Sequence, residues 1–151
     1  MLRRAGCGTL IVVPGITIRS YGAADEAAVV RLWRSCDLTT PANDPQHDIR
    51  LKVAFQPDLF LVATLGADVI GTVMAGWDGH RGWINYLAVA PQAQRRGIGR
   101  DLMATAEARL RALGCGKINL QVRGSTANVV AFYERIGFAV EDRIGLGKRL
   151  P

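Results

Sequence analysis

The segment at residues 94–100 has residue types and a spacing that suit the binding of an anion. It reads Gln-Arg-Arg-Gly-Ile-Gly-Arg and directly precedes a segment with helical periodicity. Glycine lets a backbone approach a ligand closely, and the N–H groups in the first turn of a helix have no partner within that helix. The positive end of the helix dipole and the side chains of Arg95, Arg96 and Arg100 add to the attraction. The spacing therefore predicts a pyrophosphate-binding loop, whereas an isolated Gly-x-Gly marks an ordinary turn.

Two other phosphate-binding loops do not fit this segment. The chain has no Gly-Lys-Ser/Thr of the kind that binds nucleoside triphosphates. Position 102 is leucine, where a dinucleotide-binding fingerprint has its third glycine.

The loop lies between a predicted strand, Trp83–Val89, and a predicted helix that begins beyond Pro91. One face of that helix carries apolar residues at helical spacing, namely Ile98, Leu102, Ala106, Leu110 and Leu113. Gly114 is typical of a helix end, and Ile118–Val122 is typical of a strand. Strand, helix and strand form a crossover unit, so we expect the two strands to pair in parallel.

The chain before Trp83 predicts a strand, two helices and two further strands. Ile16–Tyr21 alternates apolar and polar residues, and a helix follows. The inner face of that helix is predicted to hold Val29, Leu32, Trp33 and Cys36, with Asp25 and Glu26 in its first turn. A shorter helix begins at Asp44-Pro45, ends near Gln56-Pro57 and has Ile49 and Val53 on its inner face. Leu59–Leu65 and Val69–Ala75 then form antiparallel strands together with Trp83–Val89.

The last part of the chain predicts a helix over Asn128–Ile136 that ends at Gly137. Phe138–Val140 and a segment around Arg143–Leu150 are predicted to be closing strands.

Composition bounds the class of protein. The 151 residues are 49% hydrophobic and 21% charged, which fits one globular domain. Three scattered cysteines favour neither a disulfide framework nor a structural zinc site. No apolar run approaches the ~18 residues of a membrane span, so we expect a cytoplasmic protein. Residues 1–15 are predicted to be an extension, with an edge strand at Leu10–Val13 as the alternative.

The formal net charge of +6 comes from 16 Arg and 3 Lys against 13 acidic residues, and the basic residues are dispersed along the chain. Such a distribution is more typical of a solvated surface than of a polyanion-binding patch. We therefore expect neither a nucleic acid nor a membrane as partner.

Residues 94–99 resemble motif A of the GNAT superfamily of N-acetyltransferases, which reads Gln/Arg-x-x-Gly-x-Gly/Ala. Residues 128–138 are similar to a second segment of that family, Asn-x-x-Ala-x-x-Tyr-Glu-x-x-Gly-Phe, and the two occur in the family's order and spacing. The resemblance covers about Ile16 to Leu150, and shorter strings such as residues 77–82 look like the small bacterial YpeA-type branch. It implies an α/β GNAT fold over residues 16–151, with a mixed, mostly antiparallel sheet flanked by helices and strands that splay apart at an acetyl-CoA cleft.

The resemblance also implies residue roles, with acetyl-CoA as co-substrate and no metal. The coenzyme A-binding residues would be Leu87, Ala88, Val89, Gln94, Arg95, Arg96, Gly97, Ile98, Gly99, Arg100 and Asn128. Backbone groups of Leu87 and Val89 would polarise the thioester carbonyl, and Asn128 would bind the pantetheine arm. Tyr133 would be the general acid that protonates the departing thiolate. Because neither motif contains a cysteine, we expect direct transfer without an acyl-enzyme.

One position departs from relatives that acetylate protein N-termini: Gln121 stands where they carry Glu. An amide cannot accept a proton, so the general base stays open among a water chain, Asp78, His80 and Glu141. A second open question concerns the carboxylates that flank the loop between the first two helices, Asp37, Asp44 and Asp48. They could bind a cationic acceptor, although Asp44 is also explained as a helix cap and Asp48 as a first-turn charge.

These residues favour an enzyme that transfers acetyl groups to a primary amine of a small molecule or of a peptide N-terminus. The alternatives are a non-catalytic acyl-CoA-binding module of the same fold and a basic nucleic-acid-binding domain. Tyr133 favours the enzyme over the module, and the absence of an aromatic-basic RNA motif disfavours the third reading. Both a monomer and a homodimer are compatible with the sequence.

Overall fold

A computed structural model describes residues 15–124 and 127–151. The chain divides into two compact units, of which the first ends at Leu120 and the second is Gln121–Pro151. The predictions for residues 1–14, including the edge strand at Leu10–Val13, lie outside the described residues.

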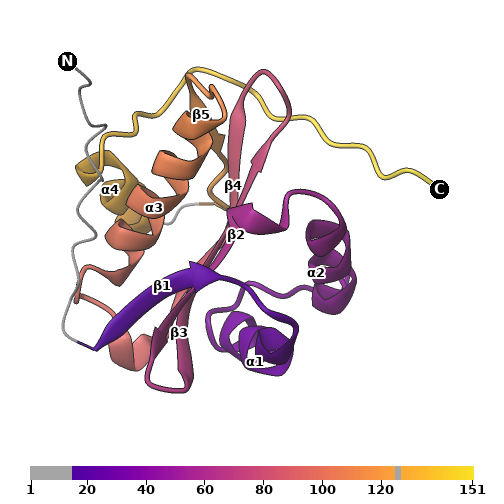
Figure 1. The fold of residues 1–151 in the computed structure, drawn as a ribbon. Coiled ribbons are helices and arrows are strands. Elements are labelled where there is room, and N and C mark those ends of the chain that lie inside the picture. Colours follow the sequence, from indigo (N-terminus) through magenta and orange to yellow (C-terminus); the bar gives the residue numbers. More distant parts are fainter. Residues whose placement is uncertain (1–14, 125–126) are drawn as a thin grey trace, which may run out of the picture. The chain divides into compact units, whose positions relative to one another are not determined.

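The first unit contains a five-stranded sheet with the strand order β1-β2-β3-β4-β5. Its strands are β1 (Ile16–Ser20), β2 (Phe60–Leu65), β3 (Asp68–Trp77), β4 (Gly82–Val89) and β5 (Ile118–Leu120). The pairings from β1 to β4 are antiparallel, and β4 pairs with β5 in parallel (Figure 1). The mixed, mostly antiparallel sheet and its crossover unit are therefore confirmed.

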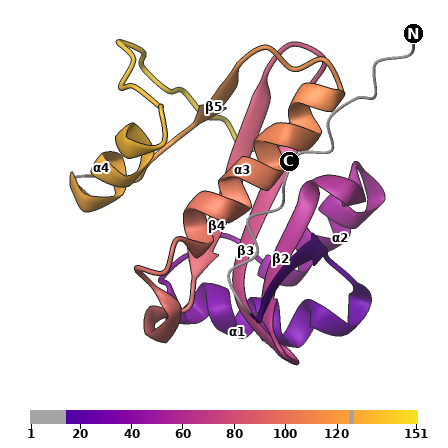
Figure 2. The ribbon, with the colours of Figure 1, turned by 60° about the vertical axis from the view of Figure 1, so that its left-hand side comes forward.

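Helices cover both faces of this sheet. Helices α1 (Glu26–Ser35) and α2 (Pro45–Ala54) lie on one face, and α3 (Ile98–Ala112) lies on the other (Figures 1 and 2). Three short 3₁₀ turns, Ala23–Asp25, Pro57–Leu59 and Pro91–Ala93, precede α1, β2 and α3. Because both faces are covered, successive residues of β2 are buried on alternate sides and the strand reads as a continuous apolar run.

Two apolar side chains lie away from the helix faces predicted for them. Leu113 is 52% exposed because it follows the last residue of α3 as its C-cap. On α2, Ile49 is buried as predicted, but Val53 is 45% exposed and Lys52 is buried in its place. Positions three and four residues beyond Ile49 can both face inward on a helix, and the orientation of α2 brings the third inward.

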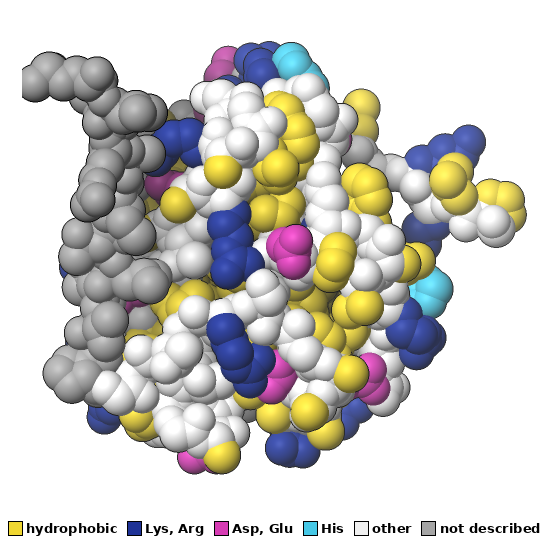
Figure 3. Space-filling model, in the orientation of Figure 1, with side chains coloured by type: hydrophobic (Ala, Val, Ile, Leu, Met, Phe, Trp, Pro, Cys, Tyr) yellow, Lys and Arg dark blue, Asp and Glu magenta, His cyan; other side chains and the backbone are white. Residues whose placement is uncertain are grey.

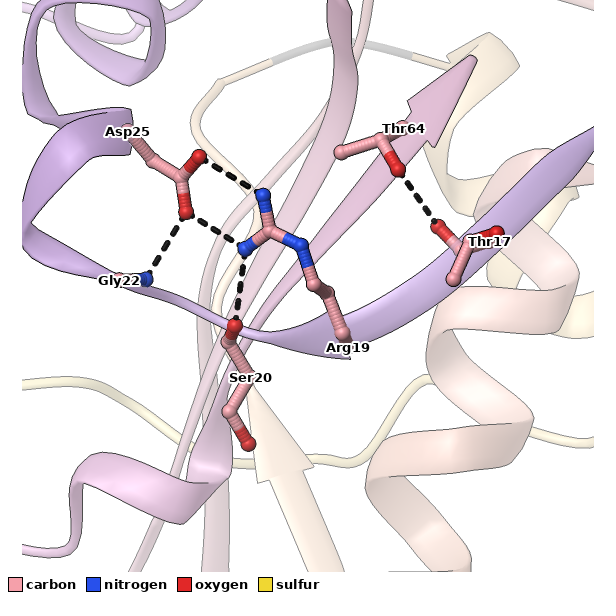
Figure 4. Close-up of polar contacts among 6 residues, drawn as sticks. All are labelled: Thr17, Arg19, Ser20, Gly22, Asp25 and Thr64. Atoms are coloured by element: carbon pink, nitrogen blue, oxygen red, sulfur yellow. Dashed lines mark hydrogen bonds and ion pairs between the residues drawn. The ribbon is translucent and has the colours of Figure 1, made fainter. Parts of the chain in front are cut away.

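The corner between β1 and α1 is fixed by an ion pair (Figure 4). Arg19 donates two hydrogen bonds to the carboxylate of Asp25, at 2.7 and 2.9 Å, and the Gly22 N–H donates a third at 2.8 Å. Asp25 is buried in the 3₁₀ turn before α1. The hydrogen bond from Arg19 lowers the pKa of this carboxyl, against the opposing effect of burial. From α3, Arg109 donates to Ser20 Oγ at 2.7 Å, which ties that helix to the same corner.

The second unit contains one helix, α4 (Ala127–Arg135), close to its predicted position. Gly137, at φ +99°, ends it, and the Phe138 N–H donates to the Tyr133 carbonyl at 3.0 Å.

The predicted closing strands are wrong: within 121–124 and 127–151 the second unit has no strand, and β5 stops two residues before its predicted end. The apolar residues of the tail are strongly exposed, between 76% and 94%, namely Val140, Ile144, Leu146 and Leu150. Alternation alone does not make a strand, because its N–H and C=O groups need a neighbouring strand as partner.

The described surface carries dispersed charge. Lys and Arg side chains lie at several separate places on the face that Figure 3 draws. No helix within residues 15–124 and 127–151 combines the length and the apolar composition needed to cross a lipid bilayer.

Candidate functional site

The predicted anion-binding loop has the backbone geometry that its glycines suggested. Gly97 is the N-cap of α3 with φ 78° and ψ 8°, a left-handed conformation that glycine adopts without strain. The first helical hydrogen bond runs from the Asp101 N–H to the Gly97 carbonyl at 3.0 Å. The N–H groups of residues 98–100 therefore have no partner within the helix, and no side chain caps them. Such an end can bind an anion.

Three exposed arginines surround this helix end. Arg95 adopts a left-handed backbone at φ 64°, and Arg96 follows in the same exposed loop. Arg100 contacts Asp101 at 3.3 Å and folds back over Gly97, since a Cβ at position 97 would lie 2.9 Å from Arg100 Nη2. The charge predicted for the loop is thus present around it.

The Val89 carbonyl joins this loop to the end of β4. Gln94 Nε2 donates to it at 3.2 Å, and the thiol of Cys36 donates at 3.4 Å. Cys36 is half-buried, and burial raises the pKa of its thiol. The helical spacing predicts an apolar core position for Cys36, whereas the structure places its thiol at the end of the strand expected to hold the thioester.

Strand β4 carries a bulge immediately before that end. Thr72 pairs with Ala88 and Met74 with Asn85, so Tyr86 and Leu87 both lie opposite Val73. Such bulges re-aim side chains and occur often beside active sites.

The β5 side of β4 is also open near the bulge. Strand β5 pairs only with Gly82–Ile84. From Asn85 to Val89, β4 therefore has no paired strand on that side among the described residues. This opening corresponds to the predicted splay and leaves backbone groups that an extended ligand could meet.

Buried aromatic and hydroxyl groups hold the bulge in place. Tyr86 has φ +50° and stacks on Trp33 with ring centroids 3.8 Å apart. Trp33 Nε1 donates to Thr72 Oγ1 at 2.9 Å, and that hydroxyl donates to the Tyr86 carbonyl at 2.9 Å. Trp33 and Thr72 are both fully buried. This network fixes a backbone conformation that a tyrosine rarely adopts unsupported.

Of the three carboxylates considered for the acceptor, one reaches the bulge. Asp48 accepts a 2.6 Å hydrogen bond from the Tyr86 hydroxyl. Asp44 caps α2 by accepting from the Gln46 N–H at 3.0 Å, and Asp37 is exposed in the turn after α1. The capping role proposed for Asp44 is confirmed, whereas Asp48 does more than carry a first-turn charge.

The hairpin candidates are held in a turn. Asp78 accepts hydrogen bonds from the backbone N–H groups of His80 and Arg81, at 2.7 and 2.6 Å, and from Trp83 Nε1 at 3.2 Å. These donors, the Arg81 N–H first among them, lower the pKa of Asp78. A carboxylate so satisfied is a weak base, and His80 is exposed beside it.

The second unit carries the remaining candidates. Tyr133 lies half-buried with Phe132 and Phe138 edge-on to its ring, at 5.1 and 5.6 Å between centroids. Burial raises the pKa of Tyr133 to about 12. Its phenol is therefore protonated at neutral pH and can donate a proton. Asn128 is exposed near the start of α4, and the Gln121 amide lies over Gly145.

Sequence reasoning missed two residues, Tyr86 and Lys52. The sequence places Tyr86 only within the predicted strand Trp83–Val89, and it places Lys52 only among the dispersed basic residues of a solvated surface. The spacing of Lys52, four residues after Asp48 on one helix, was the signal that could have found it.

Residues 27–138 match the acetyltransferase (GNAT) family. The chain is 46% identical over 133 residues to an acetyltransferase of Pectobacterium atrosepticum, which covers 88% of this chain and 94% of the relative. The crystal structure of Chaetomium thermophilum Naa20 in complex with a bisubstrate analogue is similar at a TM-score of 0.67 and 27% identity, covering 82% of this chain and 71% of that one. The PaiA N-acetyltransferase of Thermoplasma acidophilum, in complex with coenzyme A, shares the fold at a TM-score of 0.73 and 20% identity, covering 86% and 93%. The chain therefore belongs to the acetyltransferase (GNAT) family and is an N-acetyltransferase.

Proposed function

We propose that this enzyme moves the acetyl group of acetyl-CoA directly to a primary amine of a small molecule or of a peptide N-terminus. The observation that carries the proposal is the start of α3, where Gly97 leaves the N–H groups of residues 98–100 without partners in the helix. The Naa20 and PaiA structures support it, since one holds a bisubstrate analogue and the other coenzyme A.

The residues of the first unit fit acetyl-CoA in three places. The pyrophosphate would bind the N–H groups at the start of α3, with Arg95, Arg96 and Arg100 around it. A Cβ at Gly97 would meet the guanidinium of Arg100, which is expected to lie against this anion. The pantetheine arm would extend along the open side of β4. The family resemblance adds Asn128, in the second unit, as a hydrogen-bonding partner of that arm. Backbone groups of Leu87 and Val89 would then polarise the thioester carbonyl.

The chemical step needs one proton donor and one proton acceptor. The neutral amine nitrogen attacks the thioester carbon, so that a C–N bond forms and the C–S bond breaks. The departing thiolate takes the proton of the Tyr133 hydroxyl, and the attacking amine loses a proton to a base or to water. Because burial raises the pKa of Tyr133 to about 12, its phenol is protonated at neutral pH and has a proton to give.

The identity of the base bears on which amines can react. Gln121 cannot take a proton. Deprotonating a lysine side chain, with a pKa of about 10.4, costs roughly 4 kcal/mol at neutral pH, whereas an α-amine near 8 costs about 1 kcal/mol. An α-amine is therefore the easier acceptor for this enzyme.

The test is a screen for release of free coenzyme A thiol from acetyl-CoA with amino acids, polyamines, aminoglycosides and peptides as acceptors. With the best acceptor, we expect Tyr133→Phe to lower kcat by about 10²–10⁴ with little change in acetyl-CoA affinity. Tyr21→Phe is the matched control, because Tyr21 stacks on Phe60 in the core at 4.5 Å. Acetyl-CoA binding without thiol release from any amine would favour the non-catalytic module instead.

A further inference from the structure

The side chain of Lys52 is buried and has no polar partner among the described residues. The residue is 8% exposed, and its Nζ lies against β3, 3.9 Å from where a Cβ at Gly76 would be. Among the described residues, Nζ has no hydrogen-bond partner and no ion-pair partner. Every fully buried polar side-chain atom among the described residues has a hydrogen-bond partner. Because Nζ has none, it must touch solvent, while the aliphatic part of the side chain is enclosed.

This arrangement is costly for an ammonium group. Burial lowers the pKa of Lys52 to about 8, and no neighbouring carboxylate offsets that effect. A lysine with a solvated tip normally reaches bulk water, where its charge is fully hydrated. An anion brought to Nζ would remove the cost, so this position can bind one.

Asp48 lies one helical turn before Lys52 on the same side of α2. One oxygen, Oδ2, accepts from the Tyr86 hydroxyl at 2.6 Å, while no described group donates to the other. The carboxylate and the ammonium are more than 4.0 Å apart, since they form no ion pair. Four residues of helix advance about 6 Å, so the two charges face the sheet as a separated pair.

On the basis of the proposed function, we propose that Asp48 and Lys52 bind opposite ends of the acceptor, which is a free α-amino acid. Asp48, with Tyr86, holds the amine, and Lys52 holds the carboxylate. The amine nitrogen and the carboxylate oxygens of an amino acid are about 3 Å apart, and a hydrogen bond of about 2.8 Å at each end extends the reach to about 9 Å. Asp48 and Lys52 leave the helix about 6 Å apart, so their side chains span this length when their charged ends diverge.

The position of Tyr86 connects this pair to the acetyl group. Tyr86 is a bulge residue, and Leu87, whose backbone is expected to meet the thioester, follows it directly. An amine bound at Asp48 would therefore lie one tyrosine side chain away from the strand segment expected to present the acetyl carbon. A peptide N-terminus would place an uncharged amide near Lys52 and leave the ammonium unpaired.

The test compares free L-amino acids with the matching L-amino acid amides, following thiol release from acetyl-CoA. The amide is the easier amine to deprotonate, so intrinsic reactivity alone favours it. We expect the free acid nevertheless to be at least tenfold better in kcat/KM. Lys52→Met should remove this preference to within twofold while turnover of the amide persists, and Lys52→Arg should retain it. Lys148→Met, in the exposed tail, is the matched control and should behave as wild type.

Asp48→Asn tests the amine end of the site separately from the carboxylate end. It should weaken the reaction of free acids and of amides alike, because both carry the amine. Equal use of acid and amide by the wild type would overturn this inference and leave the proposed function standing. If Lys52→Met kept the wild-type preference for the free acid over the amide, this inference would also be overturned and the proposed function would stand. Absence of thiol release with every amine would overturn both. Denaturation of each variant checks that it is folded, and Lys52→Met should be no less stable, since it removes a buried charge.

Discussion

The pyrophosphate assignment rests on Gly97, and two substitutions there separate charge from backbone strain. Gly97 has φ +78°, where aspartate and asparagine are tolerated better than other residues. Either side chain should cost about 1 kcal/mol of folding free energy for the left-handed backbone. An added Cβ would also meet Arg100 Nη2 at 2.9 Å, but that atom is the end of a flexible side chain and can move. Gly97→Asn and Gly97→Asp should therefore be equally destabilised.

Only the aspartate places a negative charge beside the expected anion. At a separation of about 6 Å and an effective dielectric constant of about 40 for a partly exposed loop, two unit charges repel by about 1.4 kcal/mol. Two phosphate charges raise this to about 3 kcal/mol, on the order of 100-fold in affinity. Gly97→Asn should lose less than about tenfold, because its only penalties are strain and crowding.

Titration calorimetry with acetyl-CoA measures both affinities, and chemical denaturation measures both stabilities. The assignment requires Gly97→Asp to bind at least tenfold more weakly than Gly97→Asn at equal stability. Equal affinities in two folded variants would show that the pyrophosphate does not lie at this helix end. Added salt should narrow the difference between the variants, because screening weakens the repulsion.

Three further predictions follow from individual contacts. With its pKa raised by burial to about 12, Tyr133 should keep its proton well above pH 10, so a pH profile of kcat should show no fall from phenol ionisation between pH 9 and 10.5. Gly82→Ala should cost about 1–3 kcal/mol, because its Cβ would lie 2.9 Å from Cys115 Sγ, and denaturation of the double variant with Cys115→Ala should show part of this recovered. Asp25→Asn should lose about 1–2 kcal/mol at pH 7, whereas the exposed cap variant Asp44→Asn should not. Because the folded-state pKa of Asp25 is lowered, its contribution is complete above about pH 4 and is lost as the pH falls through the folded value, so the difference between wild type and Asp25→Asn should shrink in acid.

Local patterns were sufficient to predict most of the first unit. The alternation in Ile16–Ser20 survives as a half-buried strand, and the turn signals between Leu65 and Gly82 separate three antiparallel strands as expected. The parallel pairing of β5 followed from chain connectivity, since a strand-helix-strand unit has little other choice. The strands and turns depend on residues close together in the sequence, and the parallel pairing depends on the right-handedness of strand-helix-strand connections. Both can be predicted from the sequence alone.

The predicted closing strands failed for the opposite reason. Residues 143–150 alternate apolar and small or polar side chains, yet Ile144 is 89% and Leu146 is 94% exposed. Gly145 and Gly147 interrupt that segment and weaken its preference for extended structure. A strand forms only where another strand pairs with its N–H and C=O groups. The residues of one segment do not show which other segment will pair with it.

The proposed acceptor site likewise depends on contacts between segments that are far apart in the sequence. The motif at residues 94–99 specifies backbone conformation, and glycine spacing is enough to predict that. The acceptor recognition proposed for Asp48 and Lys52 depends instead on which side of α2 faces the sheet, and the helical spacing from Ile49 allows either Lys52 or Val53 to face inward. In the structure α2 turns Lys52 inward, one helical turn from Asp48, where its ammonium has no partner among the described residues. Tyr86, in the bulge, is the hydrogen-bond partner of Asp48. A rotation of α2 by one residue would expose Lys52 and bury Val53, keeping both motifs intact while removing the charge proposed to select a carboxylate. Chains that share the coenzyme-binding motif can therefore differ completely in the amine they accept.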